Sequence, residues 1–484
     1  MKRKLRLWGL CVVLTCMAMA VQGGINADSA RCALDRFAGD STLRHASLTV
    51  AVSHIATGKV VASHNIDLAC ITASTMKTVT GATALRLLGP DYVFKTHVKL
   101  VGATKGSKFK GQVVVQGSGD PTLGSAYFDS NTNLVQEVLL ALQARGIKKI
   151  EGEIVVDSSL IPFPPYNSWW GVDDLAWNYG MGIHGLNYHD NRVKLSFDVP
   201  MAGQVSHVCF TPPVPGLGYV NRLDTVNHDN VDLYLEYGTP AVVLAGSAKV
   251  GEHYGMTIAN PLPQSMLADS LARTLQAHDV KLKIKPQVLG KLQQVDTILL
   301  VEHHSPPLQE IIASLLDRSD NMFTEGLLRA IAHQQGRQAT ASQGVAVVDS
   351  LWRASGLDTS PLFQRDGSGL ARANKCSARF LTEMLNYMAS HPCEGTTLSQ
   401  LMPTAGRRIG PLLENHGMER DLVVKSGSMT GVQCFVGYYP ARLPQYSWAV
   451  LINDWNGSRT HLKDLISTLL IELFGSQKSA QNSL

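Results

Sequence analysis

The stretch Ser74-Thr75-Met76-Lys77 follows a short apolar segment and opens a run with helical character that extends to Leu88. Residues three apart lie on one face of a helix, so we expect the Ser74 hydroxyl and the Lys77 amine to be neighbours. A serine hydroxyl is a poor nucleophile until a base removes its proton, and a lysine shielded from water can act as that base. Most single Ser-x-x-Lys motifs are surface pairs, and residues 107–110 repeat the spacing in a charged stretch. Other parts of the chain must therefore decide what the motif means.

A second motif, Ser319-Asp320-Asn321, lies between an amphipathic helical run that ends near Leu316 and another from Met322 to Ile331. A serine and an asparagine two residues apart in a loop can point into one cleft. There the hydroxyl can relay a proton, and the amide can fix a lysine or a substrate carbonyl. The alternative is helix capping, which Ser, Asp and Asn all do well.

The third motif, Lys425-Ser426-Gly427, follows a predicted strand at Leu422–Val424. A strand edge can bind an extended peptide by adding it as a further strand. Lys425 would attract a terminal carboxylate, Ser426 would offer a hydrogen bond, and Gly427 would let the backbone approach closely. The alternative is a solvated strand end followed by a turn.

Together the motifs occur in the order S-x-x-K, S-x-N and K-[ST]-G, which is the signature of penicillin-binding proteins and class A β-lactamases. The long gap between Ser74 and Ser319 resembles the class C low-molecular-mass penicillin-binding proteins, the serine D-alanyl-D-alanine carboxypeptidase/endopeptidase family. Residues 116–123 (QGSGDPTL) resemble the G-x-G-D-P turn of that family, and residues 366–370 (DGSGL) resemble its D-G-S-G-L segment. The resemblance extends over Leu48 to Leu473.

The resemblance implies a reaction at Ser74, which would attack a D-Ala-D-Ala bond, or a D-Ala-meso-diaminopimelate cross-link, in peptidoglycan. The acyl-enzyme would then be hydrolysed by water, and β-lactams would acylate the same serine as inhibitors. Lys77 would be the base, Ser319 would pass a proton to the leaving amine, and Asn321 would position Lys77 and the substrate. The family resemblance implies neither a cofactor nor a metal.

The resemblance also assigns the substrate carboxylate to Lys425, Ser426 and Gly427. Ser426 stands where the family more often has threonine, which keeps the hydroxyl. In this family an inserted domain reaches the cleft near residues 170–191, so Asp174, or its neighbour Asp173, would meet a cationic group of the stem peptide. An exposed loop carboxylate is the alternative.

A chain of 484 residues usually holds more than one domain. We predict an α+β fold in which a β-lactamase/transpeptidase-like domain, an antiparallel sheet covered by helices, is split by inserted β-rich domains. The catalytic domain would take residues 21–91 and 293–484, inserted domain II residues 92–190 and 265–292, and β-rich domain III residues 191–264. Predicted strands of the catalytic domain are Leu48–His54 and Lys59–His64, which form a hairpin, and Leu422–Val424, Val432–Tyr439 and Tyr446–Asn453.

The N-terminus has four basic residues within its first six positions, then an apolar run from Leu7 to Ala20 that ends in Ala-Met-Ala. This pattern predicts a signal peptide over residues 1–20 and export to the periplasm or cell-wall space, with no transmembrane segment in the mature chain. The alternatives are an uncleaved anchor or a lipid on Cys16. The formal net charge of +4 belongs wholly to this segment. Charge therefore gives no reason to expect a nucleic-acid partner.

Six cysteines remain after residue 20, namely Cys32, Cys70, Cys209, Cys376, Cys393 and Cys434. An exported chain could pair them in up to three disulfides, whose pattern the sequence leaves open, or keep some as buried thiols.

Three rival functions remain. A metal hydrolase could use His184, His189 and Asp190, or His303 and His304, but no H-E-x-x-H motif is present. A β-lactamase of the same fold would differ only in how fast the acyl-enzyme is hydrolysed. An inert cell-wall-binding module would not need the nucleophile. The oligomeric state stays open.

Overall fold

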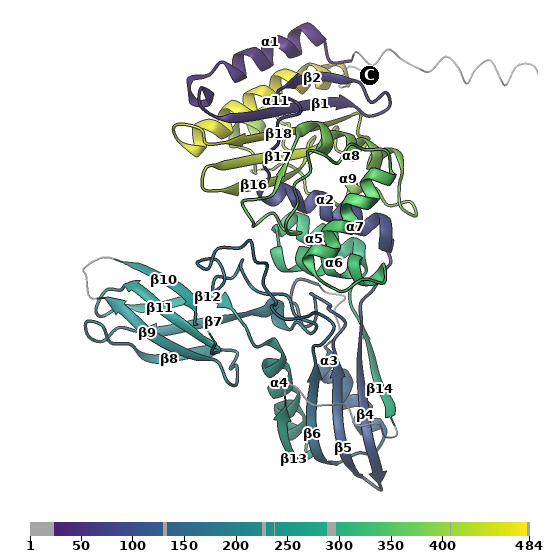
Figure 1. The fold of residues 1–484 in the computed structure, drawn as a ribbon, viewed down its shortest axis with the longest axis vertical. Coiled ribbons are helices and arrows are strands. Elements are labelled where there is room, and N and C mark those ends of the chain that lie inside the picture. Colours follow the sequence, from purple (N-terminus) through teal and green to yellow (C-terminus); the bar gives the residue numbers. More distant parts are fainter. Residues whose placement is uncertain are drawn as a thin grey trace, which may run out of the picture.

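The computed structural model describes residues 24–128, 133–224, 229–236, 238–287, 297–406 and 408–481. The predicted signal peptide, residues 1–20, lies outside them. None of the helices within these ranges is long and apolar enough to span a bilayer. Three parts are visible in Figure 1: a helix-covered sheet formed by both ends of the chain, a second sheet far from it, and a set of strands to one side.

The first part is built on a five-stranded antiparallel sheet in the order β16-β17-β18-β1-β2 (Figure 1). Its strands are β1 (Ser47–His54), β2 (Val60–His64), β16 (Val423–Met429), β17 (Val432–Tyr439) and β18 (Tyr446–Asn453). The antiparallel pairing of β1 with β2 confirms the predicted hairpin. β16 continues to Met429, so Lys425-Ser426-Gly427 lies inside a strand, not after it as predicted.

Helices cover both faces of this sheet. One face packs against α1 (Ala27–Ala38), α10 (Pro411–Asn415) and α11 (Arg459–Gln481). On the other face α8 (Ala378–Ser390) packs against the sheet. It shares a core with α2 (Met76–Leu88), α5 (Leu308–Arg318), α6 (Asn321–Gln334), α7 (Ala341–Ala354) and α9 (Leu398–Leu401). In β1, Val50 and Val52 join the first core and Ala51 joins the second, because successive strand residues face opposite sides. This arrangement confirms the predicted α+β class with a sheet covered by helices.

The second part holds a mixed sheet in the order β13-β6-β5-β4-β14. Its elements are β4 (Lys95–Lys105), β5 (Lys108–Gln116), α3 (Leu134–Ala144), β6 (Lys149–Asp157), α4 (Pro263–Ala277), β13 (Lys281–Gln287) and β14 (Thr297–His304). Apolar side chains of α3 and α4 share a core with β4. β14 pairs with β4, so the inserted sheet takes a strand from the segment after residue 292 that we had assigned to the catalytic domain.

The third part is made of two three-stranded sheets, β12-β7-β8 and β10-β11-β9. Their strands are β7 (Arg192–Asp198), β8 (Ser206–Thr211), β9 (Gly218–Asp224), β10 (Asn230–Leu235), β11 (Ala241–Ser247) and β12 (His253–Ala259). These strands have the β-rich character that we expected of the insertion.

A short strand pair lies next to helix α2. β3 (Cys70–Ile71) pairs with β15 (Lys375–Cys376), which places Cys70 opposite Cys376. All six cysteines after residue 20 are free thiols in the structure, four of them buried. The buried-thiol alternative therefore describes Cys70, Cys376, Cys393 and Cys434.

Candidate active site

Ser74 lies in a single 3-10 turn, Ala73–Thr75, that leads directly into α2. Ala73 adopts a left-handed φ of 43°, and Thr75 Oγ1 donates a hydrogen bond to Thr72 O at 2.7 Å. Left-handed backbone at a residue with a Cβ costs energy and is concentrated at functional sites. The turn holds the half-buried Ser74 at the start of the helix that carries Lys77.

Lys77 is fully buried and donates to three oxygen atoms. Its Nζ lies 3.0 Å from Ser74 Oγ, 2.6 Å from Asn321 Oδ1 and 2.7 Å from Ser368 O. All three acceptors are neutral, so the amine is positioned without a direct ion pair. The structure thus brings the first two motifs together around one amine.

Burial lowers the pKa of Lys77 from 10.5 to about 8, while the charges of Asp366, Asp320 and Glu325 act to raise it. Desolvation is the dominant cause because the charged amine loses its water. Like-charge repulsion from Lys425, which we had expected to contribute, is not among these causes. Burial lowers the pKa of Lys425 as well, and there the charge of Lys77 contributes.

Ser319-Asp320-Asn321 joins α5 to α6. Ser319 ends α5 in the left-handed conformation, with φ 59°. Asp320 caps α6 by accepting from Phe323 N at 3.0 Å, so the capping alternative describes Asp320. The side chains on either side of it point into the site, where Ser319 Oγ accepts from Lys425 Nζ at 3.0 Å.

Lys425-Ser426-Gly427 lies on β16, whose far edge is bridged at Val423 by Thr404 and beyond that has no neighbouring strand among the described residues. Lys425 is 1% exposed and also donates to Ser426 O at 2.7 Å. A Cβ on Gly427 would stand 2.7 Å from Thr72 O and 2.8 Å from Ser74 N. Any larger residue would therefore push β16 away from the serine turn.

The D-G-S-G-L segment, residues 366–370, supplies the carbonyl oxygen of Ser368 that Lys77 contacts. Glu325 on α6 accepts from Gly367 N at 2.8 Å and from Ser368 N at 2.9 Å, and this fixes the carbonyl that Lys77 contacts. Asp366 accepts from Gly369 N at 2.7 Å and from Trp170 Nε1 at 2.8 Å. Burial raises the pKa of Asp366 to about 6.

The loop after β6 forms the wall of the site that comes from the inserted domain. Asn321 Nδ2 donates to Tyr179 O at 2.8 Å. The Tyr179 hydroxyl is hydrogen-bonded to the half-exposed Asp174, and burial raises the pKa of that carboxyl. Asp174 is thus linked to Asn321 through a single residue. No described interaction brings Asp174 to Ser74 itself.

Two supporting residues could not be singled out from the sequence. Glu325 is an ordinary helical position, and Tyr179 contacts Asn321 only through its backbone oxygen. Ser368 lies in the D-G-S-G-L segment, which was identified by its resemblance to the family. The sequence did not predict that its backbone carbonyl would accept a hydrogen bond from Lys77. The histidines considered for a metal do not converge: within the described ranges, no group of three His, Cys, Asp or Glu side chains could hold a metal ion.

Comparison with known proteins agrees with this geometry. Residues 30–467 match the model of the D-Ala-D-Ala carboxypeptidase 3 (S13) family. The D-alanyl-D-alanine carboxypeptidase of Actinomadura sp. strain R39 is 26% identical over 95% of this chain and 88% of its own length. D-alanyl-D-alanine carboxypeptidase DacB of Haemophilus influenzae is 23% identical over 82% and 83%.

Among solved structures, penicillin-binding protein 4 of Haemophilus influenzae has the same fold. It superposes with a TM-score of 0.77 at 22% identity, covering 93% of this chain and 99% of that one. A second structure of that protein, in complex with a β-lactam, gives a TM-score of 0.71 at 21% identity and covers 90% and 96%. Since the family model spans most of the chain, the protein belongs to the D-Ala-D-Ala carboxypeptidase 3 (S13) family.

Proposed function

We propose that this protein is a serine peptidase of peptidoglycan that works through an acyl-enzyme on Ser74. The observation that carries the proposal is the 3.0 Å contact from Lys77 Nζ to Ser74 Oγ, made by an amine whose burial lowers its pKa to about 8. A general base must lie within hydrogen-bond reach of the proton it removes and titrate near the working pH. Lys77 satisfies both conditions.

In the acylation step, neutral Lys77 accepts the Ser74 proton as Oγ attacks the carbonyl carbon of the penultimate D-Ala. The tetrahedral intermediate then collapses with cleavage of the C–N bond. The leaving amine takes up the proton that Lys77 received, relayed through the hydroxyl of Ser319, which contacts Lys425 at 3.0 Å, and Lys77 becomes neutral again. Water hydrolyses the resulting ester and returns Ser74 to its starting state.

The open edge of β16 is where we place the substrate, as an added strand. Lys425, Ser426 and Gly427 hold its terminal carboxylate. The leaving amine belongs either to a free terminal D-Ala, which is carboxypeptidase activity, or to meso-diaminopimelate of a second stem peptide, which is endopeptidase activity. Asp174 binds a cationic group of the stem peptide.

The N-terminal pattern supports export, so we place the mature protein in the periplasm or cell-wall space, with peptidoglycan stem peptides as its substrates. β-Lactams are its inhibitors, because ring opening by Ser74 leaves an ester in the same site.

A labelled penicillin tests the proposal. We expect one adduct per chain, on Ser74, and no adduct in Ser74→Ala. Purified protein should then release D-Ala from a pentapeptide or cleave cross-linked muropeptides, and the ratio of the two rates divides the two activities. Absence of an adduct under native conditions would indicate an inert binding module. Rapid turnover of penicillin without peptide cleavage would indicate a β-lactamase.

A further inference from the structure

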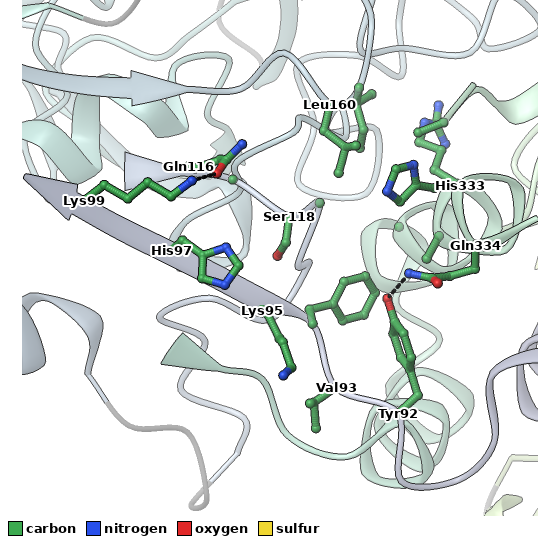
Figure 2. A pocket seen from close by; sticks show the side chains of 18 residues that line it. Tyr92, Val93, Lys95, His97, Lys99, Gln116, Ser118, Leu160, His333 and Gln334 are labelled. Atoms are coloured by element: carbon green, nitrogen blue, oxygen red, sulfur yellow. Dashed lines mark hydrogen bonds between the residues drawn. The ribbon is translucent and has the colours of Figure 1, made fainter. Parts of the chain in front are cut away.

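A second cavity lies between the inserted sheet and the C-terminal half of α6, away from Ser74. Its volume is about 740 Å³. Strand β4 and the turn after β5 form one wall, and His333 and Gln334 of α6 form the opposite wall (Figure 2). Asn321, at the start of α6, contacts the catalytic lysine, and His333 lies twelve residues later, about 18 Å along the helix. Gly326 also lines the cavity, but Ser74, Lys77, Ser319, Asn321 and Lys425 do not, so the cavity is separate from the residues around the serine.

The cavity wall is basic. Five side chains that line it are Lys95, His97, Lys99, Arg329 and His333, and no acidic residue lines it. The first three alternate along β4 and point toward the cavity in Figure 2. Alternation is expected because successive strand residues face opposite sides, and the residues between them are buried.

Neighbouring carboxylates neutralise part of this charge. Glu302 contacts Lys95 and His97, both at 3.1 Å. Glu325, on α6, forms an ion pair with the buried Arg329 at 2.9 Å. Lys99 donates to Gln116 Oε1 at 2.9 Å and has no acidic partner among the described residues. Lys99 is therefore the cation available to a ligand.

Neutral groups complete the lining. Ser118 Oγ lies 3.2 Å from Thr96 Oγ1, and Gln334 Nε2 donates to the Tyr92 hydroxyl at 3.3 Å. Leu160 adds an apolar surface (Figure 2). Val93, Phe94, Ile161 and Ala330 extend this apolar surface. Apolar surface, hydroxyls and amides beside a basic wall match a short peptide that carries apolar side chains and a carboxylate, and the volume lies in the range of sites for small ligands.

We propose that this cavity is a second, non-catalytic binding site for a carboxylate-bearing peptide, which Lys99 and His333 hold from opposite walls. This proposal rests on the proposed function, because an enzyme of peptidoglycan meets uncross-linked stem peptides, which carry free carboxylates. The site would keep a second strand of substrate on the enzyme while the first is cleaved.

The test measures peptide binding by calorimetry after Ser74 has been blocked with benzylpenicillin and excess drug removed. Mass spectrometry of the adduct reports separately on the proposed function. We expect a tetrapeptide stem with free carboxylates to bind with 1:1 stoichiometry, and its fully amidated analogue to bind at least tenfold more weakly. Lys99→Glu should weaken binding at least tenfold. Lys105→Glu, exposed at the far end of the same strand, should leave it unchanged.

The proposal is overturned if the blocked enzyme binds no peptide, if the amidated peptide binds equally well, or if Lys99→Glu binds with unchanged affinity. Inorganic phosphate provides one further arm. If phosphate displaces the peptide at equal concentration, the cavity is a general oxyanion site and the assignment to a peptide is wrong. If it does not, the peptide assignment is supported.

Discussion

Replacing Asn321 with aspartate exchanges the amide nitrogen for an oxygen and places a carboxylate against Lys77, the proposed base. The amide oxygen of Asn321 lies 2.6 Å from Lys77 Nζ, so Asn321→Asp would turn a neutral contact into an ion pair. An opposite charge this close favours the protonated amine and raises its pKa by ~1–3 units. The base would then be available only at higher pH.

The size of the effect follows from the titration of Lys77. With a pKa of about 8, about one amine in ten is neutral at pH 7, compared with about one in three thousand for an ordinary lysine. A rise of ~2 units in Asn321→Asp would leave about one in a thousand neutral. Acylation at pH 7 should therefore slow about 100-fold and recover as the pH rises toward 10.

Stopped-flow acylation by a fluorescent penicillin from pH 6 to 10 measures this directly. In the native protein the rate should rise with pH and level off above a midpoint near the pKa of Lys77, about 8. Asn321→Ala is the matched control, because it removes the amide contact to Lys77 without adding charge, so it should slow the reaction without raising the midpoint. A midpoint for Asn321→Asp equal to or below the native one would refute Lys77 as the base.

Three further changes test the rest of the site. Gly427→Ala should slow acylation ~100-fold, because its Cβ would meet the serine turn at 2.7–2.8 Å and displace the reacting groups. The control is Gly218→Ala, whose Cβ has an ordinary 3.8 Å contact and which should react at the native rate. Equal acylation rates in the two variants would contradict the close approach of Gly427 to the serine turn. Ser319→Ala should lower peptide turnover by roughly 10²–10⁴ with an unchanged melting temperature, as measured by D-Ala release, and native turnover would exclude Ser319 from proton transfer. Asp174→Asn should raise KM about tenfold for a stem peptide with a free side-chain amine, because a charge-assisted hydrogen bond is lost. The rate of penicillin acylation should be unchanged. If Asp173→Asn raises KM by the same factor, the assignment to Asp174 is wrong.

Much of the catalytic sheet could be predicted from the sequence, because its strands are long, apolar and bounded by turns. β17 and β18 have the bounds that the pattern indicated. β14 was assigned to the wrong part, since periodicity predicts a strand but not its partner, and β4, which pairs with it, lies far away in the chain. By contrast, α3 carries Leu134, Val135, Val138, Leu139 and Leu142 on one buried face, a helical spacing that was present in the sequence and overlooked.

The three motifs of the site could be found because each has a fixed local spacing. What holds them together could not, since the contact between Glu325 and the Gly367–Ser368 backbone depends on the packing of α6 against a distant loop. The same applies to the pKa of Lys77. Its direction could be argued from burial, but the acids around it come from two distant segments, Asp320 and Glu325 at the start of α6 and Asp366 in a later loop.

Lys77 can serve as a base only if the surrounding carboxylates do not raise its pKa too far. They must still offset part of the cost of burying its charged form. Asp320 and Glu325 both act to raise its pKa, yet neither is bonded to it. Asp320 contacts Arg192 Nη2 at 2.7 Å, and Glu325 contacts Arg329 Nη1 at 2.9 Å. Each of these two carboxylates thus has its own arginine, which weakens its electrostatic field at the Lys77 amine.

Asp366, the remaining acid, is held differently. Among the described residues no arginine forms an ion pair with it. Burial raises its pKa only to about 6, below that of Lys77, so Asp366 still carries its negative charge in the range in which Lys77 titrates. That charge is spread over bonds from backbone amides and the Trp170 indole, none of which competes for the lysine. A neutral amide as the nearest acceptor, with carboxylates one layer further out, keeps the amine in place while its pKa stays about 8. A carboxylate in direct contact with Lys77 would hold the amine just as firmly. It would also raise the pKa of Lys77, and the neutral amine that acts as the base would then be lost near pH 7.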